Sequence, residues 1–231
     1  MADWYIGMNE EAIRERVVKE AVKWLGVQEG TYDHKKIVDT YNSQNELPRG
    51  YKLKYSDPWC AGFISFLGIA LDISHVILPE VGCGEMINKY RKAGRWQEAD
   101  DYKPRPGDII MYDWQAEKGE SLGNPDHVGI VEKVVGKTIT TIEGNYDNRV
   151  KRREIPIEYI KTRGFCLPDY GSLVQTFADV DPNAWYAGYV ARAAELGLME
   201  GVGGGLFEPK QPLNRAEAAA LAVRVVELMG K

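Results

Sequence analysis

Two residues of this 231-residue chain have the types and settings of a nucleophile and its base, and the first is Cys60. It follows Asp57-Pro58-Trp59, and a proline at or just before the first turn favours a helix start. A cysteine in that turn lies near unpaired backbone N–H groups and the positive end of the helix dipole, which favour the thiolate. Its own N–H could help to bind an oxyanion. A free cysteine is more often a small buried apolar side chain.

His127 strengthens the catalytic interpretation through a predicted β-hairpin. It begins an alternating run, and Val135-Gly136-Lys137 is typical of a hairpin turn. A turn there places His127 roughly opposite residues 143–146, where Glu143 and Asn145 share strand parity and face the same side. A carboxylate and an amide beside an imidazole can fix its tautomer and stabilise its charged form. Taken singly, these residues are more simply a structural histidine, a solvated strand end and a turn residue.

The remaining cysteines and histidines have no such support. The three cysteines, Cys60, Cys83 and Cys166, are odd in number and unrelated in spacing, so neither a disulfide framework nor a paired-cysteine metal site is expected. We interpret Cys83 and Cys166 as structural. His75 is expected in a loop and His34 at a helix cap, and the histidines form no metal-ligand pattern.

The elements that must position these residues change in kind along the chain. Apolar periodicity and end signals predict four helices, over residues 9–25, 33–41, 59–71 and 85–93. After the breaker cluster Pro104-Arg105-Pro106-Gly107, short β-type runs predict strands over 108–113, 127–135, 137–143, 149–155 and 163–167. Helices followed by antiparallel strands are typical of an α+β fold.

A second unit follows at the C-terminal end. Residues 169–176 have the composition of a linker, after which helices are expected over 185–196 and 215–229, with a glycine-rich turn over 201–205. We therefore expect one domain over residues 1–168 and a second over 177–231. The second unit occurs once.

The bulk composition excludes several function classes. The net charge of −5 lacks the basic excess that phosphate binding favours, so we expect no nucleic-acid partner. The one basic cluster is interpreted as a solvated strand face; it comprises Arg149, Lys151, Arg152 and Arg153. No run approaches the roughly 18 to 20 apolar residues that span a bilayer. The short acidic N-terminus is not typical of a signal peptide.

Four blocks of sequence resemble the CHAP domain, named for cysteine, histidine-dependent amidohydrolases/peptidases. They are Trp59-Cys60-Ala61-Gly62-Phe63, Pro104-Arg105-Pro106-Gly107-Asp108-Ile109-Ile110, Asp126-His127-Val128-Gly129-Ile130-Val131 and Ile142-Glu143-Gly144-Asn145. Their order and spacing match the family over roughly residues 10–168. The resemblance implies a papain-like α+β fold that cleaves amide bonds in peptidoglycan.

The resemblance also implies roles for particular residues. Cys60 would attack the scissile carbonyl and form a thioester, while His127 deprotonates the thiol and later protonates the leaving amine. The family's acidic residue and its Asn correspond to Glu143 and Asn145, which would orient the imidazole. Many members carry Gln before the Cys, where Trp59 stands here, so a side-chain oxyanion donor is missing. Residues 30–57 lack the Asp-rich calcium loop of some members, so no metal or cofactor is expected and calcium dependence stays open.

The C-terminal unit resembles one S-layer homology repeat. The matching blocks are Phe177-Ala178-Asp179-Val180, Trp185-Tyr186, residues 194–201, Phe207-Glu208-Pro209 and Leu213-Asn214-Arg215-Ala216-Glu217. Such repeats bind secondary cell-wall polysaccharide, which implies a small all-helical module with Trp185, Gly201 and Arg215 at a sugar site. In the alternative, Asn214 and Glu217 only form a capping box and Trp185 is a core residue. A single copy could oligomerise, bind weakly or only stabilise the chain.

These features predict a peptidoglycan hydrolase, for example a phage endolysin, with bacterial peptidoglycan and secondary cell-wall polysaccharide as partners. Lacking a signal peptide, it would be made in the cytoplasm and reach the wall through lysis or a holin-type route. The alternative is a non-catalytic cell-wall polysaccharide-binding protein with a CHAP-like scaffold, and a weaker one is a papain-like protease acting on ordinary proteins. Amidase and endopeptidase cleavage are not separated, because the same Cys and His serve both.

Overall fold

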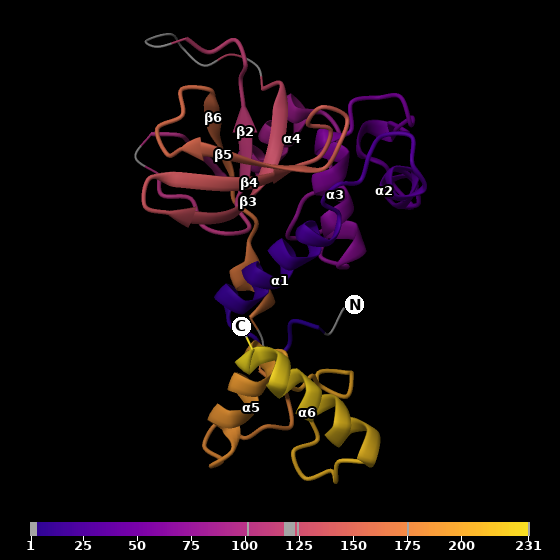
Figure 1. Cartoon of the computed structure of the whole chain (residues 1–231), viewed down its shortest axis with the longest axis vertical. Helices are drawn as coiled ribbons and strands as arrows, with labels where there is room; N and C mark the ends of the chain where they lie inside the picture. The colour runs from indigo at the N-terminus through magenta and orange to yellow at the C-terminus, as the bar shows by residue number, and fades with distance from the viewer. Residues whose placement is uncertain (1–3, 101, 118–122, 124, 175, 231) are drawn as a thin grey trace. The chain divides into compact units, whose positions relative to one another are not determined.

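The chain forms two compact units (Figure 1). The computed structural model describes residues 4–100, 102–117, 123, 125–174 and 176–230. One unit is Arg14–Asp169; the other combines Met1–Ile13 with Tyr170–Lys231. The N-terminal segment thus groups with the C-terminal unit rather than with the expected first domain. Its partners explain this: the Phe177 ring lies against Gly7, and the Asn9 amide donates to Glu195 over 2.6 Å.

The expected linker also carries structure. Tyr170–Leu173 is a short 3-10 helix, η2, whose Tyr170 and Leu173 are buried. Residues 169–176 therefore include packed side chains, which a composition of turn-forming residues does not reveal.

The helices of the larger unit confirm the four predicted helices, with ends shifted by at most two residues. They are α1 (Glu10–Lys23), α2 (Tyr32–Asn42), α3 (Cys60–Ala70) and α4 (Cys83–Lys92). The first turn of α1 belongs to the other unit, and a 3-10 helix, η1, lies at Pro48–Gly50. The Asn9 side chain accepts the Ala12 N–H and so caps α1, as its position before the helix predicts. Helix α3 is buried over residues 60–68, as its apolar composition requires.

A six-stranded antiparallel sheet follows the helices and confirms the α+β prediction. Its strands are β1 (Trp96–Glu98), β2 (Ile109–Tyr112), β3 (His127–Val135), β4 (Thr138–Glu143), β5 (Lys151–Pro156) and β6 (Thr162–Cys166), in the order β1-β6-β2-β3-β4-β5. The β3–β4 hairpin turns at Gly136, where φ is 58°. Strand β1 was not predicted, because three residues are too few for periodicity to show.

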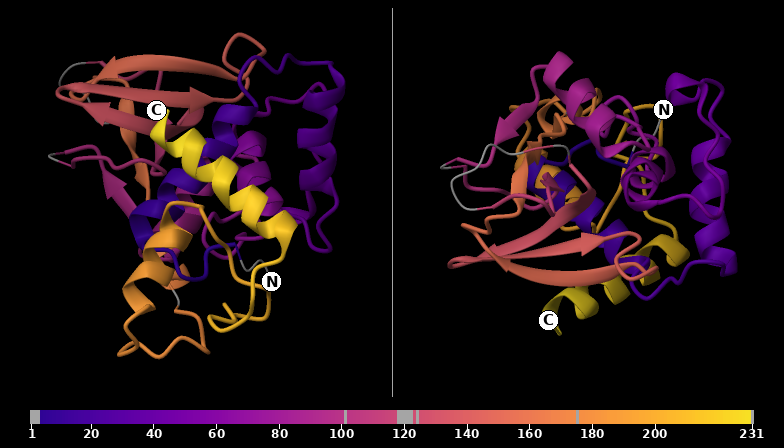
Figure 2. Two further views of the ribbon diagram at one scale, coloured as in Figure 1. Left: turned by 60° about the horizontal axis from the view of Figure 1, so that its bottom comes forward. Right: turned by 90° about the horizontal axis from the view of Figure 1, so that it is seen from above.

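The hydrophobic core of this unit places α3 beside β3 of the β3–β4 hairpin. Helix α3 packs against β3, and α2 packs against α3 (Figures 1 and 2). Buried residues of the sheet form one cluster that includes Ile110, Tyr112, Val131, Ile139, Ile155 and Phe165. This packing sets the N-terminus of α3 near the start of β3 and the end of β4.

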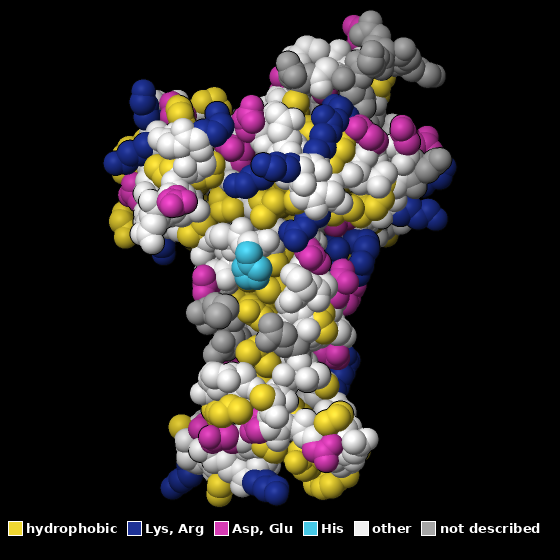
Figure 3. Space-filling model, turned by 180° about the vertical axis from the view of Figure 1, so that it is seen from behind, with side chains coloured by type: hydrophobic (Ala, Val, Ile, Leu, Met, Phe, Trp, Pro, Cys, Tyr) yellow, Lys and Arg dark blue, Asp and Glu magenta, His cyan; other side chains and the backbone are white. Residues whose placement is uncertain are grey.

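The smaller unit contains two helices, α5 (Ala187–Glu195) and α6 (Arg215–Met229), and an isolated bridge between Gly203 and Leu206. The predicted capping box is present: Asn214 accepts from the N–H of Glu217, whose carboxylate accepts from the N–H of Asn214. All residues of α6 are described and none is buried. Hydrophobic side chains are visible on the surface of this unit (Figure 3). Across the described part of the chain, no helix is long and apolar enough to cross a bilayer.

Candidate active site

Cys60 is the first residue of α3 and is 5% exposed. The preceding Trp59 is fully buried and donates its indole N–H to Glu29 over 3.1 Å. Trp59 is therefore a core residue held by its own partner, and the backbone N–H of Ala61, at the start of α3, is one of the donors to the Cys60 thiol.

His127 and Glu143 meet as predicted, and a register shift between Val131 and Lys133 in the β3–β4 pairing places them on the same face. His127 begins β3 and Glu143 ends β4, and His127 Nε2 lies 3.0 Å from Glu143 Oε2. Both side chains are nearly or fully buried, at 9% and 0% exposed. Burial alone would lower the pKa of His127, but hydrogen bonds with Cys60 and Glu143 raise it to about 9. Burial would likewise raise the pKa of Glu143, yet His127 and Arg153 hold it below its usual value.

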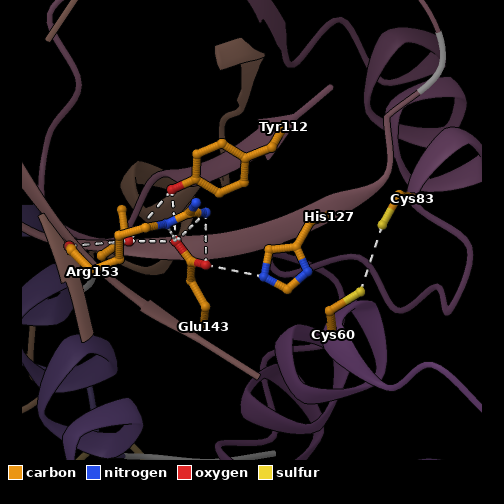
Figure 4. A network of polar contacts seen from close by, with 7 residues as sticks. Cys60, Cys83, Tyr112, His127, Glu143 and Arg153 are labelled. Atoms are coloured by element: carbon orange, nitrogen blue, oxygen red, sulfur yellow. Dashed lines mark hydrogen bonds and ion pairs between the residues drawn. The ribbon is translucent and has the colours of Figure 1, made fainter. Parts of the chain in front are cut away.

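Cys60 completes the line on the other side of the imidazole (Figure 4). The pKa of the Cys60 thiol lies well below its usual value: a hydrogen bond from Cys83 has the largest effect, and the hydrogen bond and charge of His127 add to it. Burial opposes these effects without overcoming them. The lowered pKa of Cys60 and the raised pKa of His127 both favour a thiolate beside an imidazolium, and the thiolate is the reactive form of a cysteine nucleophile.

Arg153 is a site residue that the sequence analysis missed, because it was assigned to a solvated strand face. In the structure its side chain is only 13% exposed, and Nη2 lies 2.8 Å from Glu143 Oε2. The guanidinium also lies over the rings of Tyr112, Trp114 and Tyr146, at 4.3, 4.6 and 4.9 Å from their centroids. The alternating exposure of β5 and its pairing of Arg153 with Thr141 produce this placement.

Two hydroxyl groups complete the surroundings of the Glu143 carboxylate. Tyr112 donates its phenolic O–H to Oε1 over 2.8 Å, and Thr141 donates to the same oxygen over 2.7 Å. Arg153 donates to Oε1 as well, and Oε2 accepts from Arg153 and faces His127. Strand parity alone could have suggested Thr141, which lies two residues before Glu143 on the same face.

Asn145 lies beside this line without joining it. Among the described hydrogen bonds none links Asn145 to His127, and its Oδ1 is buried without a partner. Its φ of 55° is in the left-handed region, as at a turn residue. The orienting role of Asn145 therefore stays a prediction.

The other two cysteines and two histidines differ in their surroundings. Cys83, interpreted from the sequence as structural, has its Sγ 3.9 Å from Cys60 Sγ and therefore lies beside the candidate site. Cys166 is buried, and burial raises its pKa well above the usual value. His75 is an exposed turn residue, as expected. His34 is buried in the first turn of α2, where Thr31 rather than His34 provides the cap.

Of the three predicted sugar-site residues, two line one groove of the smaller unit and the third does not. Trp185, 83% exposed, and Gly201 both line a groove of about 780 Å³, whereas Arg215 at the start of α6 does not and Arg224 does. The exposure of Trp185 contradicts its alternative assignment to the core. A Cβ on Gly201 would lie 2.6 Å from the Leu206 carbonyl oxygen and from the Phe177 ring, so close packing alone requires this glycine.

Within the described ranges, no group of three or more His, Cys, Asp or Glu side chains is arranged to hold a metal ion. Calcium dependence stays a question for experiment.

The larger unit is thus an α+β domain in which a carboxylate, an imidazole and a cysteine thiol lie together. The chain matches the CHAP domain family over residues 50–145 and the S-layer homology domain family over residues 176–219. It therefore contains one domain of each family.

Two curated relatives match a short stretch of the chain. The chain is 42% identical over 55 residues to a surface-layer 125 kDa protein of Lysinibacillus sphaericus, covering 24% of this chain and 5% of that protein. It is 42% identical over 50 residues to a cell surface protein of Thermoanaerobacter kivui, covering 22% of this chain and 7% of that protein. The chain thus spans a small fraction of the length of these relatives.

Solved structures share a partial likeness with the chain. One is Ly7917 with the hydrolyzing product of MDP, at 19% identity and a TM-score of 0.33, covering 47% of this chain and 53% of that one. Another is Ly7917 alone, at 20% identity and a TM-score of 0.31, with the same coverage.

Proposed function

We propose that this protein is a peptidoglycan hydrolase that cleaves an amide bond with Cys60 as nucleophile and His127 as its base. The observation that carries the proposal is the buried line Glu143–His127–Cys60, with 3.0 Å between the first two side chains and a lowered pKa at the thiol. The match to the CHAP domain family supports the same chemistry.

The reaction follows from the charges of the site. The Cys60 thiolate attacks the scissile carbonyl carbon, and the N–H groups at the start of α3 stabilise the developing oxyanion. The His127 imidazolium gives its proton to the leaving amine, which leaves a thioester on Cys60. Neutral His127 then takes a proton from water, whose oxygen attacks the thioester and releases the acid. Glu143 remains ionised throughout and orients the imidazole.

The smaller unit would hold the enzyme at the wall. Its S-layer homology match and its groove lined by Trp185 and Gly201 support binding of secondary cell-wall polysaccharide. The participation of Arg215, oligomer formation and release through lysis or a holin-type route, as in a phage endolysin, are parts of the same hypothesis. The competing function is wall binding without catalysis, which the exposed groove alone would support.

Digestion of purified peptidoglycan tests the catalytic proposal. We expect the wild-type protein and Cys166→Ala, the matched buried cysteine, to release soluble fragments, and Cys60→Ala to release none. Free stem peptides with an N-terminal alanine would indicate an amidase, and cut stems still attached to glycan would indicate an endopeptidase. Equal release by Cys60→Ala and the wild type would refute the mechanism.

Cosedimentation with intact sacculi tests the binding proposal independently. We expect Trp185→Ala to weaken binding, whereas Met229→Ala, which removes another side chain that is 82% exposed, should not. Binding that persists in Cys60→Ala, together with an absence of digestion by the wild type, would favour the non-catalytic function.

A further inference from the structure

A second thiol lies beside the proposed nucleophile. Cys83 Sγ is 3.9 Å from Cys60 Sγ, and the two side chains point toward each other from the first residues of α4 and α3 (Figure 4). Cys83 lies across the nucleophile from His127, and it is more exposed than Cys60. None of the catalytic steps above uses it.

The fold holds the two thiols together through the segment that precedes Cys83. Ser65, one turn after Cys60 in α3, accepts the N–H of Glu80 over 2.7 Å and donates to its carbonyl over 2.6 Å. The Glu80 carboxylate accepts from Arg49 and from the N–H groups of Val81 and Gly82. The N-terminus of α4 is therefore tied directly to α3, and the proximity of the thiols is a built feature of the site.

We propose that Cys83 is a resolving thiol, which forms a reversible disulfide with Cys60 when a peroxide oxidises the nucleophile. The Cys60 thiolate attacks one peroxide oxygen, breaks the O–O bond and becomes a sulfenic acid, with hydroxide leaving. The sulfur of Cys83 then attacks the Cys60 sulfur; the S–O bond breaks, the proton of Cys83 passes to the departing oxygen, and water leaves. A dithiol such as dithiothreitol reduces the disulfide and restores both thiols.

The charges of the two groups suit these steps. Cys60 is the thiolate, and a thiolate is the form that peroxide oxidises. The pKa of Cys83 is raised first by its hydrogen bond to Cys60, then by burial and by the negative charge of Cys60. Oxidation to the neutral sulfenic acid removes that charge, so Cys83 becomes more acidic when it must act as the attacking thiol.

The distance is also suitable. A disulfide needs the sulfurs about 2.05 Å apart, and the two sulfurs are already 3.9 Å apart and directed toward each other. The consequence for the enzyme rests on the proposed function: the disulfide would block catalysis but protect Cys60 from irreversible oxidation to the sulfinic acid.

The test treats the full-length protein with a small molar excess of hydrogen peroxide, followed by dithiothreitol. Intact and peptide mass spectrometry under non-reducing conditions should show a product lighter by two hydrogen atoms, with Cys60 linked to Cys83. Peptidoglycan digestion, scaled to each variant's own untreated rate, should return after reduction in the wild type and in Cys166→Ser. In Cys83→Ser it should not return, and Cys60 should carry two or three added oxygens.

The mass readout separates this inference from the proposed function. A Cys60–Cys83 disulfide supports the inference even if no wall preparation is digested. The inference is overturned if oxidation links Cys60 to Cys166, if Cys60 is over-oxidised in the wild type as fast as in Cys83→Ser, or if no disulfide forms.

Discussion

Replacing Arg153 by methionine tests how far the Glu143 carboxylate depends on its cationic partner. Methionine keeps an apolar stem between the surrounding aromatic rings and removes only the charge and the donors. The matched control is Arg152→Met on the same strand, where the guanidinium is 48% exposed and pairs with Glu132 over 2.7 Å. The two variants therefore differ in the burial of the ion pair that is lost.

The structure sets the expected magnitudes. Removing one partner of a buried pair typically costs about 3–5 kcal/mol, because the other charge is left without compensation. Glu143 is fully buried but keeps hydrogen bonds from Tyr112, Thr141 and His127, so we expect the lower end, about 3 kcal/mol, for Arg153→Met. An exposed pair contributes about 0–1 kcal/mol, which is the loss expected for Arg152→Met.

The pH dependence gives the prediction a second readout. The folded-state pKa of Glu143 is lowered, so its ionised form contributes stability above the unfolded value of about 4.3, and this is lost as the pH falls through the folded pKa. Without the guanidinium of Arg153 that pKa rises. The difference between wild type and Arg153→Met should therefore be largest near neutral pH and shrink in acid.

Urea unfolding, followed by tryptophan fluorescence at several pH values, measures these differences. Equal losses in Arg153→Met and Arg152→Met at neutral pH would refute the argument that burial makes the first pair stronger. A difference that does not change with pH would refute the assignment of the effect to the charge of Glu143.

Two further predictions follow from the site. The pKa of Cys60 is held low by Cys83 and then by His127, so iodoacetamide should label Cys60 below pH 7. The variant His127→Gln should slow that labelling about tenfold for each unit by which the pKa of Cys60 rises. Peptide mass spectrometry locates the label, and unchanged labelling in the variant would contradict the thiolate–imidazolium pair. Gly144→Ala would place a Cβ 2.5 Å from a buried side-chain carbon, so it should lower the free energy of unfolding in urea by about 1–3 kcal/mol. The control is Gly84→Ala, which has open space around its Cβ and should lower that free energy by less than about 0.5 kcal/mol.

Local patterns predicted much of the fold and part of the site. The helices and all strands but β1 follow from periodicity, caps and turn residues, which act over a few neighbouring positions. The turn at Gly136 indicated which strands pair, but it does not by itself place His127 and Glu143 on one face. A register shift between Val131 and Lys133 in the β3–β4 pairing decides that, and the sequence analysis did not predict it.

Other features depend on contacts between distant segments. Arg153 lies in a basic run whose composition is typical of a solvated strand face. Only the register of β5 on β4 turns its guanidinium toward Glu143. Cys83 lies 23 residues from Cys60, and the tie between Ser65 and Glu80 brings the starts of two helices together.

What the sequence by itself determined is therefore the order of elements, the position of Cys60 at a helix start and the hairpin that begins at His127, because short-range sterics and periodicity decide these. What only the tertiary structure decided is which charges and thiols surround them and where the N-terminal segment packs. Those features arise from burial between segments far apart in the chain, and no local pattern records which segments will meet.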